Sequence, residues 1–130
     1  MNESKPIIPI RKDTVKQQLV PSIWQDTLTK IVEALKNKDY QLKKKIPGVE
    51  KLSEDDALMI AQNIKDYGDE LISLPQKSWE TSACLYMGDF WDVFIDLYTE
   101  EDGYSDLVLS LRVYESNSDY IFKVHSVYVP

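Results

Sequence analysis

The chain has 130 residues, of which 43% are hydrophobic and 28% charged, and its formal net charge is −7. This length is typical of one domain, so we expect a single domain over residues 1–130. The net acidity argues against nucleic acid as the main partner, because phosphate binding needs a basic surface.

The sparse use of cysteine, histidine and glycine limits the chemistry further. Cys84 is the only cysteine and His125 the only histidine, so a disulfide or a Cys/His zinc site within one chain is excluded. Four glycines leave little room for a phosphate-binding loop, and we expect no cofactor. The polar N-terminus lacks the apolar run of a signal peptide, and no stretch is long enough to span a membrane. We therefore expect a cytoplasmic protein that contacts no membrane.

The charges are divided unevenly along the chain. Residues 1–52 hold eleven Lys/Arg and six Asp/Glu, a balance of +5, whereas residues 53–130 hold four and sixteen, a balance of −12. An acidic surface favours a basic partner and speeds encounter with it, although a net negative charge also simply keeps a protein soluble.

Two helices are predicted in the first half, over residues 22–68, after an N-terminal arm at residues 1–21. The first helix is expected to begin at Ser22, with Gln25 completing a capping box, and the second at Ser53, ending at Gly68. Between them, lysines 43–45 and a Pro-Gly turn favour a solvated connector over a lysine run that contacts phosphate or an acidic partner. The expected buried stripes are Trp24, Leu28, Ile31, Val32 and Leu35 in the first helix and Leu58, Ala61, Ile64 and Tyr67 in the second.

From residue 79 onward the apolar residues alternate, which predicts four antiparallel strands in a meander. Matching the apolar faces pairs Leu97 with Leu107, and Glu115 with Tyr120. In the first hairpin, a longer loop or a bulge that aligns Leu85 with Val93 is favoured over an alignment of Leu85 with Asp92. The predicted fold is α+β, with two N-terminal helices packed on one face of a four-stranded antiparallel β-meander.

The opposite face of this sheet is predicted to be mixed rather than purely polar. Its expected rows are Asp92, Arg112 and Lys123; then Phe94, Ser110 and His125; then Asp96, Val108 and Val127. An apolar centre with a charged rim is typical of a protein interface, and Phe94, Val108 and Val127 would also suit a homodimer. Alternatively, the arm covers this face through Ile7, Ile8 and Ile10.

An enzyme is the less favoured interpretation of the same rows. His125 is a general base near neutral pH, and Ser110 with Asp92 or Asp96 completes a possible Ser/His/Asp arrangement. An open sheet face has no oxyanion hole, however, and no G-x-S-x-G element is present. A small-ligand or enzymatic site near His125 therefore remains the alternative.

The segment 100–106 carries four carboxylates, at Glu100, Glu101, Asp102 and Asp106. The spacing does not fit a calcium loop, and no metal is expected. The segment is either a solvated turn or an acidic plug for the basic cleft of a nuclease, in which carboxylates take the place of phosphates.

The strand residues 90–99 (FWDVFIDLYT), the later Ser105-Asp106-Leu107 and the closing strand 123–129 resemble small bacterial immunity proteins of polymorphic toxin systems, including contact-dependent growth inhibition. This resemblance covers about residues 79–130. It implies a cytoplasmic inhibitor, not an enzyme, that binds one cognate toxin domain, often a nuclease. The expected partner-binding residues are Asp92, Asp96, Glu100, Glu101, Asp102 and Asp106. The oligomeric state and the identity of the toxin stay open.

Overall fold

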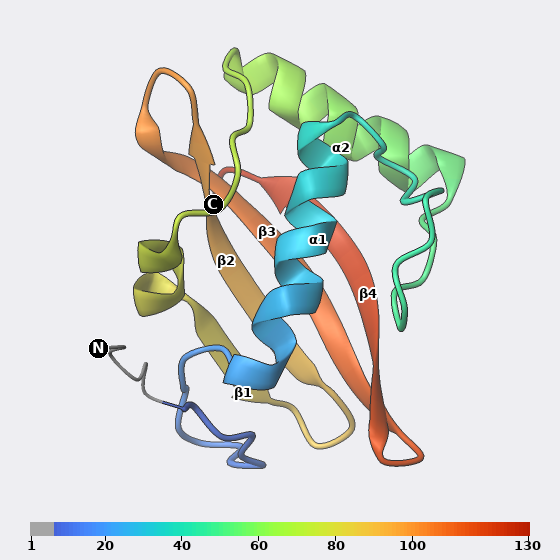
Figure 1. Cartoon of the computed structure of the whole chain (residues 1–130), viewed down its shortest axis with the longest axis vertical. Coiled ribbons are helices and arrows are strands. Elements are labelled where there is room, and N and C mark those ends of the chain that lie inside the picture. The colour runs from blue at the N-terminus through green and yellow to red at the C-terminus, as the bar shows by residue number, and fades with distance from the viewer. Residues whose placement is uncertain (1–6) are drawn as a thin grey trace, which may run out of the picture.

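A computed structural model describes residues 7–130 and places two α-helices on one face of a four-stranded antiparallel sheet of order β1-β2-β3-β4 (Figure 1). The predicted fold class is confirmed. The elements are η1 (Ser22–Trp24), α1 (Gln25–Lys36), α2 (Glu54–Tyr67), η2 (Gln76–Thr81), β1 (Ala83–Tyr86), β2 (Trp91–Thr99), β3 (Gly103–Ser116) and β4 (Asp119–Tyr128). The sheet thus begins at residue 83, not 79, because residues 76–81 form a 3-10 helix.

The first helix begins differently from the prediction. The Ser22 hydroxyl accepts a hydrogen bond from the Ile8 amide (2.7 Å), so it ties down the arm and does not cap a helix. A 3-10 turn precedes α1, and no side chain caps the start of either element. The predicted apolar stripe is nevertheless buried in full, from Trp24 to Leu35.

The second helix has the predicted ends but a different buried face. The Ser53 hydroxyl accepts from the Asp56 amide at 3.1 Å, and Gly68 ends the helix in the left-handed conformation. Ala57, Ile60 and Ile64 are buried, whereas Leu58 is 68% exposed. The prediction for Leu58 was wrong because residues 57, 60 and 64 have helical spacing too, and it is their side that packs on the sheet.

The strand registers follow the alternating apolar residues wherever the alternation is unbroken. Val93 lies opposite Leu111, and Glu115 opposite Tyr120, as predicted. Leu97 and Leu107 are both buried, but a register shift after Asp96 prevents their direct pairing.

The first hairpin takes the alignment that the sequence argument had disfavoured. Leu85 lies opposite Asp92, and Cys84 lies opposite Val93. No bulge is needed, because Cys84 fills the core position of β1 and Leu85 points to the other face.

A bulge in β4 changes which residues face the helices. Leu111 pairs with Val124, but Ser110 pairs with Ser126, so His125 is an extra residue. After it, Val127 lies opposite Leu109 and is fully buried. The predicted placement of Val127 on the outer face is therefore wrong, and so is the predicted row that joined Ser110 to His125.

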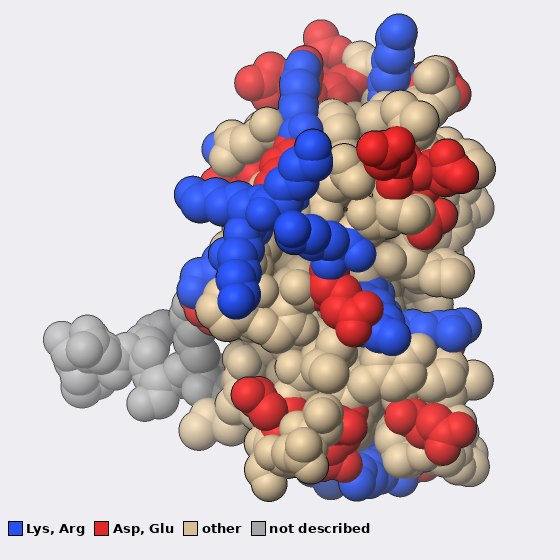
Figure 2. Space-filling model, turned by 90° about the vertical axis from the view of Figure 1, so that its right-hand side faces the viewer, with Lys and Arg blue, Asp and Glu red and all other residues tan. Residues whose placement is uncertain are grey.

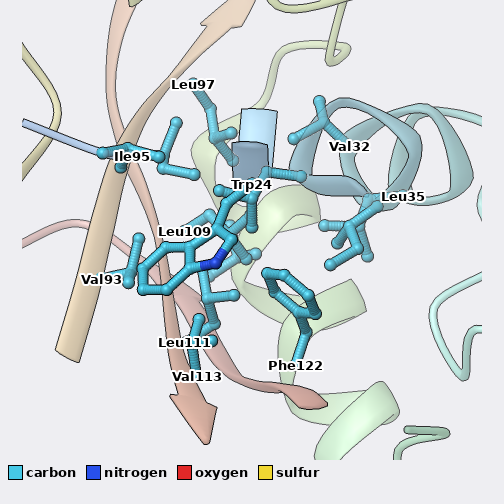
Figure 3. Packing of buried hydrophobic residues seen from close by; sticks show 14 of the residues in the cluster. Trp24, Val32, Leu35, Val93, Ile95, Leu97, Leu109, Leu111, Val113 and Phe122 are labelled. Atoms are coloured by element: carbon cyan, nitrogen blue, oxygen red, sulfur yellow. The ribbon is translucent and has the colours of Figure 1, made fainter. Parts of the chain in front are cut away.

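Aromatic side chains fill the end of the core between α1 and the sheet. Trp24 makes edge contacts with Trp91, Tyr120 and Phe122, with ring centroids 5.3, 5.4 and 6.1 Å apart. Figure 3 shows its indole beside Phe122 and the aliphatic residues of β2 and β3. Such geometry adds to the free energy gained by burying large rings.

The described part of the arm, residues 7–21, packs on the helix side of the sheet. The Trp91 indole donates to the Arg11 carbonyl (2.9 Å), and Lys12 forms an ion pair with Glu115 at 2.8 Å. Trp91 and Glu115 both belong to the face that carries the helices. The idea that the arm covers the opposite face is thus wrong for these residues, and residues 1–6 lie outside the described part.

Short backbone pairings tie three segments to the edges of the sheet. Gln18 pairs with Cys84 of β1, Val49 with Phe122 of β4, and Leu71 with Thr99 at the end of β2. A side chain supplements them, because the Asn63 amide donates to the Val127 carbonyl at 2.9 Å.

Candidate partner-binding surface

The six predicted contact residues fall into two groups in the structure. Asp92 and Asp96 lie in β2, on the sheet face opposite the helices, which we call the open face. Glu100, Glu101 and Asp102 form the turn between β2 and β3, which we call the acidic tip. Asp106 is exposed in β3, just after this turn.

Asp92 is already paired within the sheet. It lies opposite Arg112, with Arg112 Nε 3.3 Å from Asp92 Oδ1. The guanidinium also stacks over the ring of Phe90, 4.4 Å from its centroid. The negative charge of Asp92 is therefore compensated, and its first role is to hold Arg112 on the open face.

Asp96 is half-buried and accepts a hydrogen bond from the Tyr104 hydroxyl at 3.3 Å. The nearby Asp96 charge raises the pKa of Tyr104, and burial adds to this effect. The Tyr104 ring in turn contacts Tyr98, with centroids 5.7 Å apart. Asp96 thus orients an exposed tyrosine rather than offering a free carboxylate.

The acidic tip is held by backbone hydrogen bonds to the segment that follows α2. The Asp69 carboxylate accepts the amides of Glu101 (3.1 Å) and Asp102 (3.2 Å), and the Glu100 amide donates to the Glu70 carbonyl. The Thr99 hydroxyl foremost, and then these amides, lower the pKa of Asp69. The tip therefore has a defined backbone shape.

Tyr67, the last residue of α2, provides a second anchor. Its hydroxyl donates to a carboxylate oxygen of Asp102 and accepts from the Asp106 amide at 3.2 Å. The Asp102 carboxylate raises the pKa of Tyr67, because the phenol O–H donates a hydrogen bond to that carboxylate and is held in its protonated form. In Figure 1 the β2–β3 turn accordingly lies beside the end of α2.

Negative charge accumulates at this end of the molecule. In the described residues the only ion pair made by the tip or by residues 66–70 joins Lys38 to Glu70, at 3.6 Å. The C-terminus of α2 adds its own partial negative charge, for which nearby anions are unfavourable. The carboxylates gathered here are those of Asp66, Asp69, Glu70, Glu100, Glu101 and Asp102.

The apolar part of the open face is aromatic. Phe94 is 36% and Tyr104 56% exposed, and Lys123 stacks over the ring of Tyr114, 4.9 Å from its centroid. Val108, in contrast, is buried. Of the three apolar residues predicted on this face, only Phe94 is both present and exposed.

In the enzymatic alternative, Asp92 and Asp96 would support His125, but within residues 7–130 they bond to Arg112 and Tyr104 instead. Ser110 lies opposite Phe94 and Ser126, while His125 occupies the bulge and is exposed. Within residues 7–130, no group of three or more His, Cys, Asp or Glu side chains is arranged to hold a metal ion. In the same range, no helix is long and apolar enough to cross a membrane.

Sequence reasoning missed the two anchors of the tip. Tyr67 was assigned to a buried helix stripe, and Asp69 lies beyond the predicted end of that helix at Gly68. Both lie more than 30 residues from the turn that they hold, and only the way α2 packs on the sheet brings them there.

Residues 32–130 match one protein family, described as a domain of unknown function (DUF7668). No curated protein matches the chain. No solved structure matches it either.

Proposed function

The chain belongs to the DUF7668 family, and we propose that it is a protein-binding domain that recognises a basic partner with its acidic tip and the adjoining open face. The observation that carries this proposal is that the acidic tip combines exposed, unpaired carboxylates with a fixed backbone. Glu100 and Glu101 are exposed and make no ion pair with any described residue, yet their backbone is fixed by Asp69 and Glu70. A backbone that is already fixed loses little entropy on binding.

The placement of these charges supports binding rather than folding. Glu100 and Glu101, unlike Asp69, accept no amides within residues 7–130, and their charges repel the negative end of the helix dipole and each other, so they reduce stability. A basic partner relieves both repulsions. It also approaches faster, because the local field extends beyond the contact surface.

The open face supplies the less polar part of the proposed contact. Exposed aromatic rings, an arginine and a lysine occur together on it, and Tyr, Phe and Arg are enriched in protein interfaces. Because Asp92 and Asp96 already have partners in the sheet, we assign them to positioning Arg112 and Tyr104. Direct contact is assigned to the tip and to Asp106.

For the partner we propose a toxin domain with a basic cleft, such as a nuclease, which makes this chain a cytoplasmic immunity protein and not an enzyme. The support is the resemblance of residues 79–130 together with the acidic tip, whose carboxylates would occupy the phosphate sites of such a cleft.

The test is a pull-down with the product of the neighbouring gene, produced as a catalytically inactive variant. We expect a one-to-one complex that weakens as salt is added, because exposed charges are screened. In Glu100→Lys/Glu101→Lys, association should slow and lose most of its salt dependence. These positions are better suited than Asp102, whose carboxylate also binds Tyr67.

The matched control is Glu80→Lys/Asp89→Lys, which makes the same charge change at two exposed positions away from the tip. Equal effects of both double variants would show that net charge, not the tip, governs binding. If no complex forms, light scattering at two concentrations tests the homo-oligomer alternative, in which Phe94→Ser should dissociate the assembly.

A further inference from the structure

The connector between the helices presents three consecutive lysines on a fixed loop. The Asp39 carboxylate accepts the amides of Lys43 (2.9 Å) and Lys44 (3.0 Å). Leu42 and Ile46, on either side of the lysines, are buried in the core. The loop therefore cannot move freely, and the three ammonium groups project from a defined backbone.

Two of these lysines line a hollow of about 340 Å³ between the connector and α1. Lys44 and Lys45 contribute from the connector and Lys30 from the helix. Figure 2 views the side of the molecule on which the connector lies, and it shows lysine side chains gathered there in one group. The volume falls within the range of sites for small molecules, about 300–1,000 Å³.

The positive charge of the two connector lysines is not paired within the described residues. Lys30 pairs with Asp26 at 3.0 Å, but Lys44 and Lys45 make no ion pair with any described residue. An anionic group that entered between them would gain charge-assisted hydrogen bonds from both.

The Glu33 carboxylate in the lining indicates which ligands the hollow can accept besides a simple anion. Glu33 also lines the hollow, and its side chain is 39% exposed. Its Oε1 atom lies 3.6 Å from Lys36, and Oε2 has no hydrogen-bond partner among the described residues. A carboxylate that the chain leaves short of donors favours a ligand that brings a hydroxyl group. Ala34, Ile46 and Pro47 provide apolar surface between the charged groups.

We propose that this lysine hollow, lined by Lys30, Glu33, Lys44 and Lys45, binds a small phosphate ester that carries hydroxyl groups, such as a sugar phosphate. Lys44 and Lys45 bind the phosphate, Glu33 accepts from a hydroxyl, and the apolar lining contacts the carbon skeleton. This proposal is independent of the proposed partner contact, because none of its residues belongs to the tip or the open face.

The test is a titration of the ¹⁵N-labelled protein with ribose 5-phosphate, inorganic phosphate and ribose at constant ionic strength. We expect saturable shifts at the amides of residues 33–34 and 44–46 with ribose 5-phosphate, weaker ones with phosphate, and none with ribose. Lys44→Gln/Lys45→Gln should weaken binding of the ester by about tenfold or more, since hydrogen bonds to charged groups are lost.

Lys43→Gln/Lys51→Gln is the matched control, because it removes the same charge from two exposed lysines that do not line the hollow. Glu33→Ala should strengthen binding of inorganic phosphate while reducing the preference for the ester. The proposal is overturned if both lysine pairs weaken binding equally, or if Glu33→Ala leaves the preference unchanged. It is equally overturned if a short RNA binds and ribose 5-phosphate does not.

Discussion

The two faces of the sheet are built from alternating residues of the same strands, and they differ in how polar groups are treated. In β2, Trp91, Val93 and Ile95 face the helices and are at most 1% exposed. Asp92 and Asp96 alternate with these residues, face outward, and each has a partner on β3. Apolar burial on one face thus holds the fold, whereas polar contacts on the other face arrange charges and rings at the surface.

The largest expected effect tests the buried face. Trp24→Ala should lower the free energy of unfolding by about 3–5 kcal/mol, because it removes a buried ring and leaves a cavity. Phe94→Ala, on the open face, should cost less than about 1 kcal/mol. Urea denaturation measures both values.

If the alanine variant does not fold, Trp24→Phe serves instead. It keeps the aromatic contacts and removes an indole N–H that is buried without a partner, so it should be milder. Similar losses at Trp24 and Phe94 would contradict the division of roles between the faces.

The second test concerns the β4 bulge, which determines that Val127 faces the core. Deletion of His125 keeps Ser126 opposite Ser110 and Val127 opposite Leu109, so thermal denaturation should show a cost below about 1 kcal/mol. Val127→Ser, which places a hydroxyl in the core, should cost about 2 kcal/mol or more. A deletion that costs more than Val127→Ser would show that the bulge itself is needed.

A smaller effect concerns the acidic tip and depends on pH. The pKa of Asp69 is lowered in the folded chain from an unfolded value of about 3.9. The stabilisation that its charge gives is therefore complete above that value and is lost as the pH falls through the folded pKa.

The amide protons of Glu101 and Asp102 donate to Asp69, so their NMR shifts should titrate with a midpoint below about 3.9. In Asp69→Asn this titration should disappear. A midpoint above 4 at these amides would show that Asp69 does not hold the tip.

The smallest expected effect separates the two sides of α2. Leu58→Ala should change the free energy of unfolding by no more than about 0.5 kcal/mol, because Leu58 is mostly exposed. Ile60→Ala, two residues away and buried, should cost about 2–5 kcal/mol. Equal values in urea denaturation would mean that the helix presents its other side to the sheet.

The sequence predicted the fold class and the registers in the middle of the β2–β3 and β3–β4 hairpins, because unbroken alternation specifies which residues face the core. It failed where the alternation changes phase. In β4 the apolar series occupies even positions up to Val124, and the next buried apolar residue is Val127. This change of phase indicates a bulge at residues 125–126. The sequence does not show whether His125 or Ser126 is the unpaired residue.

The proposed contact surface was predictable only in part. The carboxylates of the tip are visible in the sequence because they are consecutive. Their anchoring by Asp69, and the pairing of Asp92 with Arg112 and of Asp96 with Tyr104, depend on tertiary geometry. The sequence therefore identified the charges but not which of them are free.

The short pairings at the sheet edges have a consequence for the way in which any partner can bind. Gln18, Val49 and Leu71 each take up backbone groups that a foreign strand would need at the margins of the sheet. A partner that extended this sheet by β-augmentation would have to displace these segments at Cys84, Phe122 or Thr99. The segments thus shorten the stretch of edge at which a foreign strand can pair, and they leave side-chain contacts as the route that needs no rearrangement there.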